Sequence, residues 1–230
     1  MSVDPITVEL LRNRIASVMQ EMDYHFYRSG YSTIVRESRD FSCVIVAPDG
    51  RLLVSPWMFF HSPVYYHLVK KVKEIYGEEN LVDGDVFVTN HPYEGNMPHA
   101  SDMGFIAPIF YDGKLVAFVA TIAHKADVGG TVPGSTYGSA TELYHEGMML
   151  PPIRIHSAGK PVEDIFRLIS ANTRAPYVVL GDISGQIGVT RIGRKHIKEM
   201  CRQFGPKTVL KAMDAMIVAS GKEFSSALKD

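Results

Sequence analysis

Two short segments of the chain are rich in side chains that bind metal ions. The phrase His-x-x-Asp occurs once with His99 and Asp102 and again with His124 and Asp127. Imidazole nitrogens and carboxylate oxygens are ligands that suit Zn²⁺, Mn²⁺ or Fe²⁺. Two histidines and one carboxylate leave coordination positions open, so a bound ion can activate a water molecule or polarise a carbonyl oxygen. These residue types therefore predict a mononuclear metal centre.

A predicted hairpin connects the two segments. Apolar residues over 105–111 and 115–123 flank Asp112-Gly113, which is a strong signal for a tight turn between antiparallel strands. Pairing of these strands would bring Asp102 and His124 close together at the open end of the hairpin. A single His-x-x-Asp phrase usually marks a turn or a helix cap, and the pattern alone leaves that alternative open.

The elements that must position these segments follow from hydrophobic spacing and from turn residues. Apolar residues at helical intervals after Asp4-Pro5 predict a first helix over 5–28. The tetrapeptide Ala47-Pro48-Asp49-Gly50 is a typical turn and predicts a further hairpin formed by 41–46 and 51–54. The remaining expected elements are a strand over 85–89 and helices over 64–76, 162–169, 181–204 and 207–220.

The order of these elements predicts the fold class. Helices around several hairpins favour an α+β fold with a mixed or antiparallel sheet built from hairpins, flanking helices and a mainly helical C-terminal third. Gly205-Pro206 is a dipeptide typical of turns and indicates a boundary between two segments of the chain. We therefore expect a metal-binding domain over 1–205 and a C-terminal helical segment over 206–230.

Composition excludes several classes of partner. With 24 basic and 25 acidic residues among 230, the chain has no charge excess that would attract nucleic acid or an anionic membrane. No apolar stretch approaches the roughly 18 residues that a membrane span requires, and the N-terminus does not resemble a signal peptide. The two cysteines, Cys43 and Cys201, cannot form a disulfide framework or a CxxC metal site. A reduced, cytoplasmic location is expected.

Several separate motifs occur in an order that is typical of one protein family. They occupy residues 4–9, 36–43, 84–87, 90–93, 133–135, 142–147, 171–174 and 181–183, together with the two His-x-x-Asp phrases. In these motifs the sequence resembles the hydantoinase B/5-oxoprolinase family, which also includes the large subunits of acetone and acetophenone carboxylases. The resemblance reaches to about Gly205. Family subunits are usually much longer than 230 residues, so we expect the chain to correspond to the N-terminal part of such a subunit.

The resemblance implies a metal ion bound by His99, Asp102 and His124. Asp40, in the phrase Arg-Asp-Phe-Ser, is a candidate for a further ligand. The alternative for Asp40 is a buried carboxylate that pairs with a neighbouring arginine.

Two further loop residues receive roles from the same resemblance. Asp127 completes the candidate catalytic set. It is expected to orient His124 without binding the metal itself, with a loop cap as the alternative. His91 stands where many relatives have aspartate. A hydrogen bond within its loop is expected for His91, with a spare metal ligand as the alternative.

The resemblance also implies a partner and a reaction. A hydantoinase A-type subunit would use ATP to phosphorylate the substrate, which agrees with the lack of a GxxxxGK[ST] phosphate loop in this chain. The present chain would then support metal-assisted attack of water on the activated amide of a hydantoin, 5-oxoproline or similar ring, within a hetero-oligomer. Two alternatives stay open: a subunit of an ATP-dependent ketone carboxylase, and a non-catalytic assembly subunit.

Overall fold

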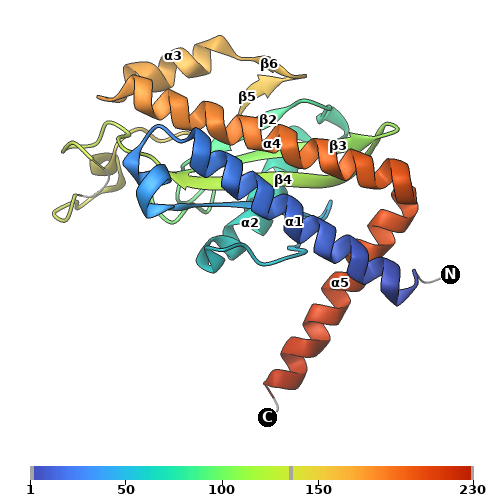
Figure 1. Ribbon diagram of the computed structural model, residues 1–230. Coiled ribbons are helices and arrows are strands. Elements are labelled where there is room, and N and C mark those ends of the chain that lie inside the picture. Colours follow the sequence, from blue (N-terminus) through green and yellow to red (C-terminus); the bar gives the residue numbers. More distant parts are fainter. Residues whose placement is uncertain (1–2, 135–136, 229–230) are drawn as a thin grey trace.

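A six-stranded antiparallel sheet forms the centre of the computed structural model, which describes residues 3–134 and 137–228 (Figure 1). The strand order is β1-β4-β3-β2-β5-β6, so the long hairpin of β3 and β4 lies inside the sheet. The strands are β1 (Phe41–Val46), β2 (Val86–Thr89), β3 (Asp102–Tyr111), β4 (Lys114–His124), β5 (Ile153–Ser157) and β6 (Lys160–Pro161). Ser135, which belongs to one of the family motifs, lies outside the described residues.

Helices cover both faces of this sheet. They are α1 (Pro5–Ser29), α2 (Ser62–Tyr76), α3 (Glu163–Ala171), α4 (Pro176–Phe204) and α5 (Pro206–Ala227). Figure 1 shows α1 and α4 side by side across one face, with α2 behind the sheet. A Cβ atom at Gly193 of α4 would lie 2.7 Å from Val119 of β4, which shows how closely α4 packs. The expected α+β class, with its antiparallel sheet and largely helical C-terminal part, is confirmed.

The N-terminal helix begins where its sequence predicts. The side chain of Asp4 accepts a hydrogen bond from the backbone N–H of Thr7 at 3.0 Å, and Pro5 stands in the first turn. Leu11, Ile15, Val18, Met19, Met22 and Phe26 then form the buried side of α1. The other predicted helices are also present, and their observed bounds are up to seven residues longer at an end.

The hairpin of β3 and β4 forms as its turn residues predict. Asp112 and Gly113 have φ values of 49° and 71°. Positive φ at both central residues is the requirement of the two-residue turn that matches the strand twist. Because helices cover both faces, the two strands are buried on both sides, and this explains why their sequences read as continuous apolar runs.

Two expectations about the sheet are wrong. Residues 51–54 do not form the return strand of a hairpin, because only one isolated bridge, between Val46 and Leu52, follows the turn. The side chains of Leu52 and Val54 pack against the hydrophobic core instead, and β1 forms its ladder with β4. In the C-terminal third, β5 and β6 extend the sheet at a place where no strand was predicted. Among the described residues, no helix has the length and apolar character needed to cross a membrane.

A carboxyl group on the packed side of α1 should make stability depend on pH. Burial raises the pKa of Asp23 to about 6 from a usual value of 3.8, although hydrogen bonds from Cys43 oppose the rise. The folded chain therefore holds this proton more tightly than the unfolded chain does. The contribution of Asp23 to stability is full below pH 3.8 and is lost as the pH rises through about 6.

We therefore expect Asp23→Asn to raise the free energy of unfolding at pH 8 by roughly 1–3 kcal/mol and to change it little at pH 4. Urea unfolding at the two pH values measures the difference. Glu9→Gln removes an exposed carboxylate from the same helix and should have little effect at either pH. Equal effects of Asp23→Asn at pH 4 and pH 8 would contradict the prediction.

Candidate metal centre

The register of three strands places a row of titratable side chains at one end of the sheet. Asp102, the first residue of β3, lies directly opposite His124, the last residue of β4. On the other side of β4, the backbone N–H of His124 donates to the carbonyl of Asp40 at 3.1 Å. Residues that lie opposite one another on adjacent strands point to the same face of a sheet. Asp40, His124 and Asp102 therefore share one face, the face that α2 covers.

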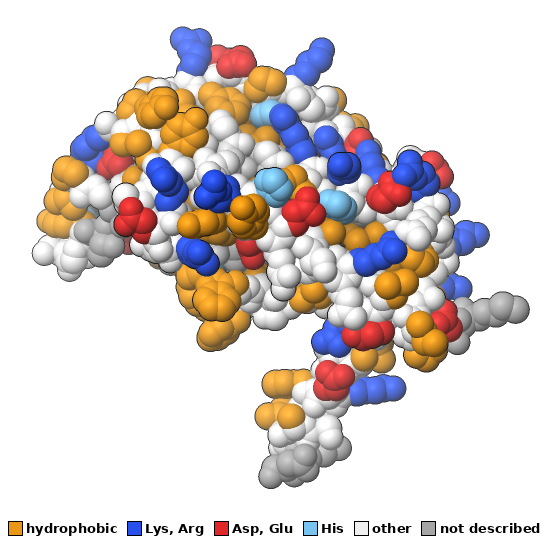
Figure 2. All heavy atoms as spheres, viewed as in Figure 1, with side chains coloured by type: hydrophobic (Ala, Val, Ile, Leu, Met, Phe, Trp, Pro, Cys, Tyr) orange, Lys and Arg blue, Asp and Glu red, His pale blue; other side chains and the backbone are white. Residues whose placement is uncertain are grey.

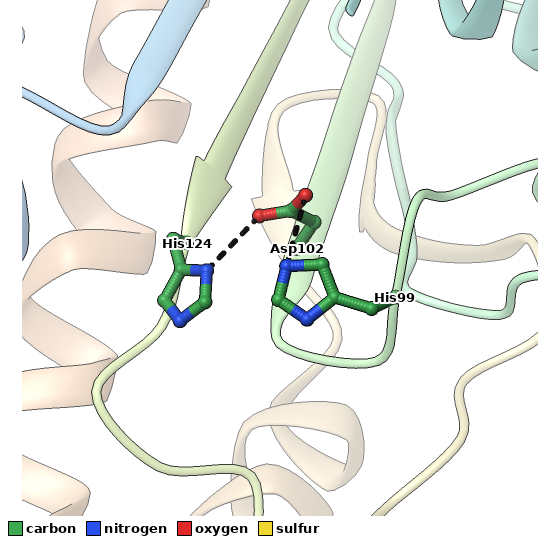
Figure 3. Close-up of side chains that lie close together, drawn as sticks. All are labelled: His99, Asp102 and His124. Carbon is green, nitrogen blue, oxygen red and sulfur yellow. Dashed lines mark ion pairs between the residues drawn. The ribbon is translucent and has the colours of Figure 1, made fainter. Parts of the chain in front are cut away.

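The loop before β3 adds a second imidazole to this row. The backbone N–H of Asp102 donates to the carbonyl of His99 at 3.1 Å, which forms a turn that returns His99 over the end of the strand. Nε2 of His99 lies 3.3 Å from Oδ2 of Asp102, and Nδ1 of His124 lies 3.4 Å from Oδ1. Figure 3 shows the carboxylate of Asp102 with one imidazole ring on each side. The structure thus brings together the three residues that sequence analysis selected.

The geometry of these residues fits a transition metal. Ligand atoms of His99, Asp102 and His124 all lie within 4.8 Å of one another. Two ligands that each lie about 2.1 Å from a shared tetrahedral ion are about 3.4 Å apart, close to the observed separations. Oδ1 of Asp102 is buried and makes no hydrogen bond among the described residues. A buried carboxylate oxygen without a hydrogen bond is costly, and a bound cation would offset that cost.

Electrostatics keep the central carboxylate ionised. Burial tends to raise the pKa of Asp102, but the adjacent His124 and His99 rings outweigh burial and hold the pKa well below its usual range. The same contact with Asp102 raises the pKa of His99. Protons and a metal ion therefore compete for the imidazole nitrogens, because only neutral imidazole can act as a ligand.

A third histidine, which the sequence motifs do not include, reaches the centre. His61 is fully buried at the start of α2, and its Nε2 lies 4.0 Å from Oδ2 of Asp102 without a hydrogen bond. Its Nδ1 lies 2.8 Å from Oγ of Ser42, which also contacts Oη of Tyr65 at 2.5 Å. Asp40, His61 and Asp102 form a second group of possible ligands. No motif marks His61, because it lies in an apolar run far from Asp102 in sequence.

Asp40 lies beside the centre and not with an arginine. Its Oδ2 is 3.8 Å from Nδ1 of His124. Within the described part of the chain, it forms no ion pair with Arg36 or Arg39, and the guanidinium of Arg39 lies over the ring of Tyr27 instead. The position of Asp40 agrees with a further ligand or with a group that holds His124 in place.

Asp127 has partners other than the one expected for it. Its carboxylate accepts hydrogen bonds from the backbone N–H of Arg174 at 2.6 Å and from Oγ1 of Thr173 at 3.1 Å. It also forms an ion pair with the Arg174 guanidinium at 2.8 Å. The observed contacts thus fasten the loop after β4 to the loop before α4, and none of them reaches His124. The sequence does not identify Arg174 as the partner, because 47 residues separate it from Asp127.

His91 has the role that was expected of it. Its Nδ1 accepts hydrogen bonds from the backbone N–H groups of Tyr93 at 3.2 Å and of Glu94 at 3.1 Å. His91 therefore stabilises the turn within its own loop, and its Nδ1 is engaged there.

A buried polar network holds the strand ends from the opposite face. Lys125 is fully buried and donates to the carbonyl of Ala123 at 3.0 Å and to Oε1 of Gln186 at 2.6 Å. Nε2 of Gln186 donates to the carbonyl of Met103 at 3.1 Å and to Oγ1 of Thr121 at 3.0 Å. Burial lowers the pKa of Lys125 to about 8. Because Gln186 lies on α4, the network links that helix to both strands that carry the centre.

Comparison with known proteins finds similar sequences and similar folds. The family model described as "Hydantoinase B/oxoprolinase" matches residues 4–230. A protein described as one of the subunits of a D-/L-hydantoinase from Pseudomonas sp. strain NS671 is 34% identical over 235 aligned residues, which cover 99% of this chain and 39% of that protein.

Two solved structures are also similar. The crystal structure of the ATP-dependent caprolactamase from Pseudomonas jessenii superposes with a TM-score of 0.92 at 26% identity, covering 100% of this chain and 40% of that one. An acetone carboxylase structure gives a TM-score of 0.78 at 19% identity over 91% of this chain and 28% of that one, and this likeness concerns the fold alone. The chain thus spans about 40% of the length of the hydantoinase and caprolactamase chains.

Proposed function

Since the chain belongs to the hydantoinase B/oxoprolinase family, we propose that it is the metal-binding catalytic part of an enzyme that opens a cyclic amide in an ATP-dependent reaction. The observation that supports this proposal is the cluster of His99, Asp102 and His124. Substrates of this class include hydantoins, 5-oxoproline and related lactams. A hydantoinase A-type partner would supply the ATP chemistry, in keeping with the relative that is named as one subunit of a hydantoinase.

The residues of the centre would have different roles because their side chains differ in exposure. Asp102 and His124 have side chains that are 4% and 10% exposed, whereas the His99 side chain is 34% exposed. Asp102 and His124 would hold the ion from the sheet, and His99 would hold it from the solvent side. The substrate would therefore approach past His99. A bound Zn²⁺, Mn²⁺ or Fe²⁺ would supply Lewis-acid chemistry by polarising the amide carbonyl or activating a water molecule.

Neighbouring side chains would prepare the centre for this work. Oδ2 of Asp40 lies 3.8 Å from the same Nδ1 of His124 that faces Asp102, so Asp40 would bind the ion as a further ligand on that side. His61 would line the buried side of the centre, where its Nε2 lies 4.0 Å from Oδ2 of Asp102. Because the chain spans about 40% of its relatives, the reaction is assigned to the assembled enzyme and not to this chain by itself.

Product analysis of the assembled enzyme tests the proposal. The subunit that contains this chain is combined with its A-type partner, ATP, Mg²⁺ and a panel of lactams that includes hydantoin, 5-oxoproline and caprolactam. We expect ring opening that requires ATP and proceeds equally with and without bicarbonate. Product that forms only with bicarbonate, and in proportion to it, would identify a carboxylase and overturn the proposal. A complex that retains metal but opens none of the rings would indicate an assembly subunit and would also overturn it.

A further inference from the structure

A cavity separate from the metal centre lies between α1, the start of β1 and the segment 54–57. Its volume is about 510 Å³, within the range of about 300–1,000 Å³ that is usual for small-molecule sites. Its lining includes Asp23, Tyr24, Tyr27, Arg39, Phe41 and Trp57. Phe41, the first residue of β1, directly follows Asp40, and successive residues of an extended chain point to opposite faces. The cavity, which we call the Asp23 pocket, therefore lies on the face of β1 opposite to the metal centre.

Two charged groups of the Asp23 pocket, Asp23 and Arg39, form no ion pair with any residue that the structure describes. Oδ1 of Asp23 is buried and makes no hydrogen bond to the residues that the structure describes. Neither Asp23 nor Arg39 forms an ion pair within residues 3–134 and 137–228. The guanidinium of Arg39 lies over the Tyr27 ring, 4.5 Å from its centroid. Burial of a carboxylate oxygen without a hydrogen bond reduces stability, and a cationic group of a ligand in the cavity would offset that cost.

The neighbours of Asp23 do not supply a positive charge to balance its carboxylate. Burial raises the pKa of the Cys43 thiol well above its usual value, so that thiol stays neutral and brings no positive charge. The aromatic walls offer an apolar surface, and the electron-rich faces of tyrosine and tryptophan rings attract cations. The pocket thus presents one negative group, one positive group and an apolar lining to whatever enters it.

We propose that the Asp23 pocket binds an apolar amino acid as a zwitterion. The ammonium group of the ligand contacts the carboxylate of Asp23, the ligand carboxylate contacts the guanidinium of Arg39, and the side chain packs against the aromatic walls. An uncharged molecule would leave both charged groups unpaired. An anion would meet the carboxylate of Asp23, and a simple cation would meet the guanidinium of Arg39, so each gains less than the zwitterion.

Three ligands with the same side chain test this assignment. L-leucine carries both charges, 3-methylbutylamine carries only the ammonium group and 4-methylpentanoate carries only the carboxylate. Trp57 is the one tryptophan of the chain and lines the pocket, so its fluorescence reports occupancy directly. We expect a saturable blue shift with L-leucine and an affinity at least about tenfold weaker for each of the other two ligands. A response to 4-methylpentanoate or to the amine that equals the response to L-leucine would overturn the assignment, as would no saturable response to L-leucine up to 50 mM, on the order of the weakest useful affinity.

Variants connect the response to the two charged groups. Asp23→Asn and Arg39→Gln should each weaken L-leucine binding at least about tenfold. Glu9→Gln and Arg12→Gln make the same charge changes on the exposed side of α1 and should leave binding unchanged. Because Asp23→Asn is expected to stabilise the fold, weaker binding by that variant cannot come from unfolding. Unchanged affinity in Asp23→Asn would overturn the proposal.

Binding of L-leucine to the Asp23 pocket is expected to be independent of the metal centre. A variant with both His99→Ala and His124→Ala should bind L-leucine as the parent chain does, because those residues lie on the opposite face of the sheet. Loss of L-leucine binding in that variant would assign the ligand to the metal centre and would overturn the proposal for the Asp23 pocket.

Discussion

Replacing His99 and His124 together with alanine should abolish tight binding of a transition metal. The parent chain is expected to hold about one equivalent of Zn²⁺, and the double variant should bind Zn²⁺ at least about 100-fold more weakly. The reason is that, of the three ligands, only the carboxylate of Asp102 would remain after both imidazoles are removed. Elemental analysis after dialysis, and calorimetric titration with Zn²⁺ and Mn²⁺, measure the change.

A matched double variant separates this centre from casual binding by surface histidines. His25 and His67 are exposed and belong to neither group of candidate ligands (Figure 2 shows the histidines of one face in pale blue). The variant with His25→Ala and His67→Ala removes the same number of imidazoles and should keep the metal content of the parent. If instead the His99 and His124 double variant retains the parent's metal, the proposed centre does not exist.

Gly129→Ala should strongly destabilise the chain and weaken its metal site. Gly129 has a φ of 80°, and a Cβ atom there would lie 2.2 Å from the backbone carbonyl oxygen of Asn172. Asp127 and Arg174 hold these two loops together, so neither loop can move aside without breaking an ion pair of 2.8 Å. We expect a loss of about 3 kcal/mol in the free energy of unfolding from strain and overpacking combined. Because the loop follows His124 directly, Zn²⁺ affinity should also fall.

Gly138→Ala is the control for this prediction. Gly138 lies in the same connection between β4 and β5, and a Cβ atom there would meet no atom within 4 Å. Urea unfolding of both variants and of the parent chain measures the difference. A loss below about 1 kcal/mol for Gly129→Ala would mean that the two loops separate easily and that the contact is not a constraint.

Local signals were sufficient for the parts of the fold that depend on neighbouring residues. Asp4-Pro5 and the spacing of apolar residues predicted α1, and Asp112-Gly113 predicted the turn of the central hairpin. The hairpin predicted for 41–46 and 51–54 is wrong although its signals were also local. The turn after β1 forms, but Leu52 and Val54 pack into the core. Strand pairing depends on which other strand competes for an edge, and β4 competes for β1 from more than 60 residues away in sequence.

The residues of the candidate centre also differ in whether the sequence could place them. Asp102 and His124 could be placed together because one hairpin joins them, and the registers of that hairpin and of β1 explain why Asp40 joins the row. His61 and Arg174 could not be placed. The first arrives with α2, which covers the same face of the sheet as the centre, and the second arrives with the loop before α4.

The amino-acid sequence by itself determined the helices, the central hairpin, the family and the three side chains of the candidate metal centre, because each of these depends on short-range spacing or on motifs. Only the tertiary structure decided the strand order, the fully buried His61 beside Asp102, the partner of Asp127 and the unpaired charges of the Asp23 pocket. Those features depend on the packing of helices against the two faces of the sheet. Packing brings together residues that no periodicity relates, and burial then decides which charges are paired and which are left without a partner.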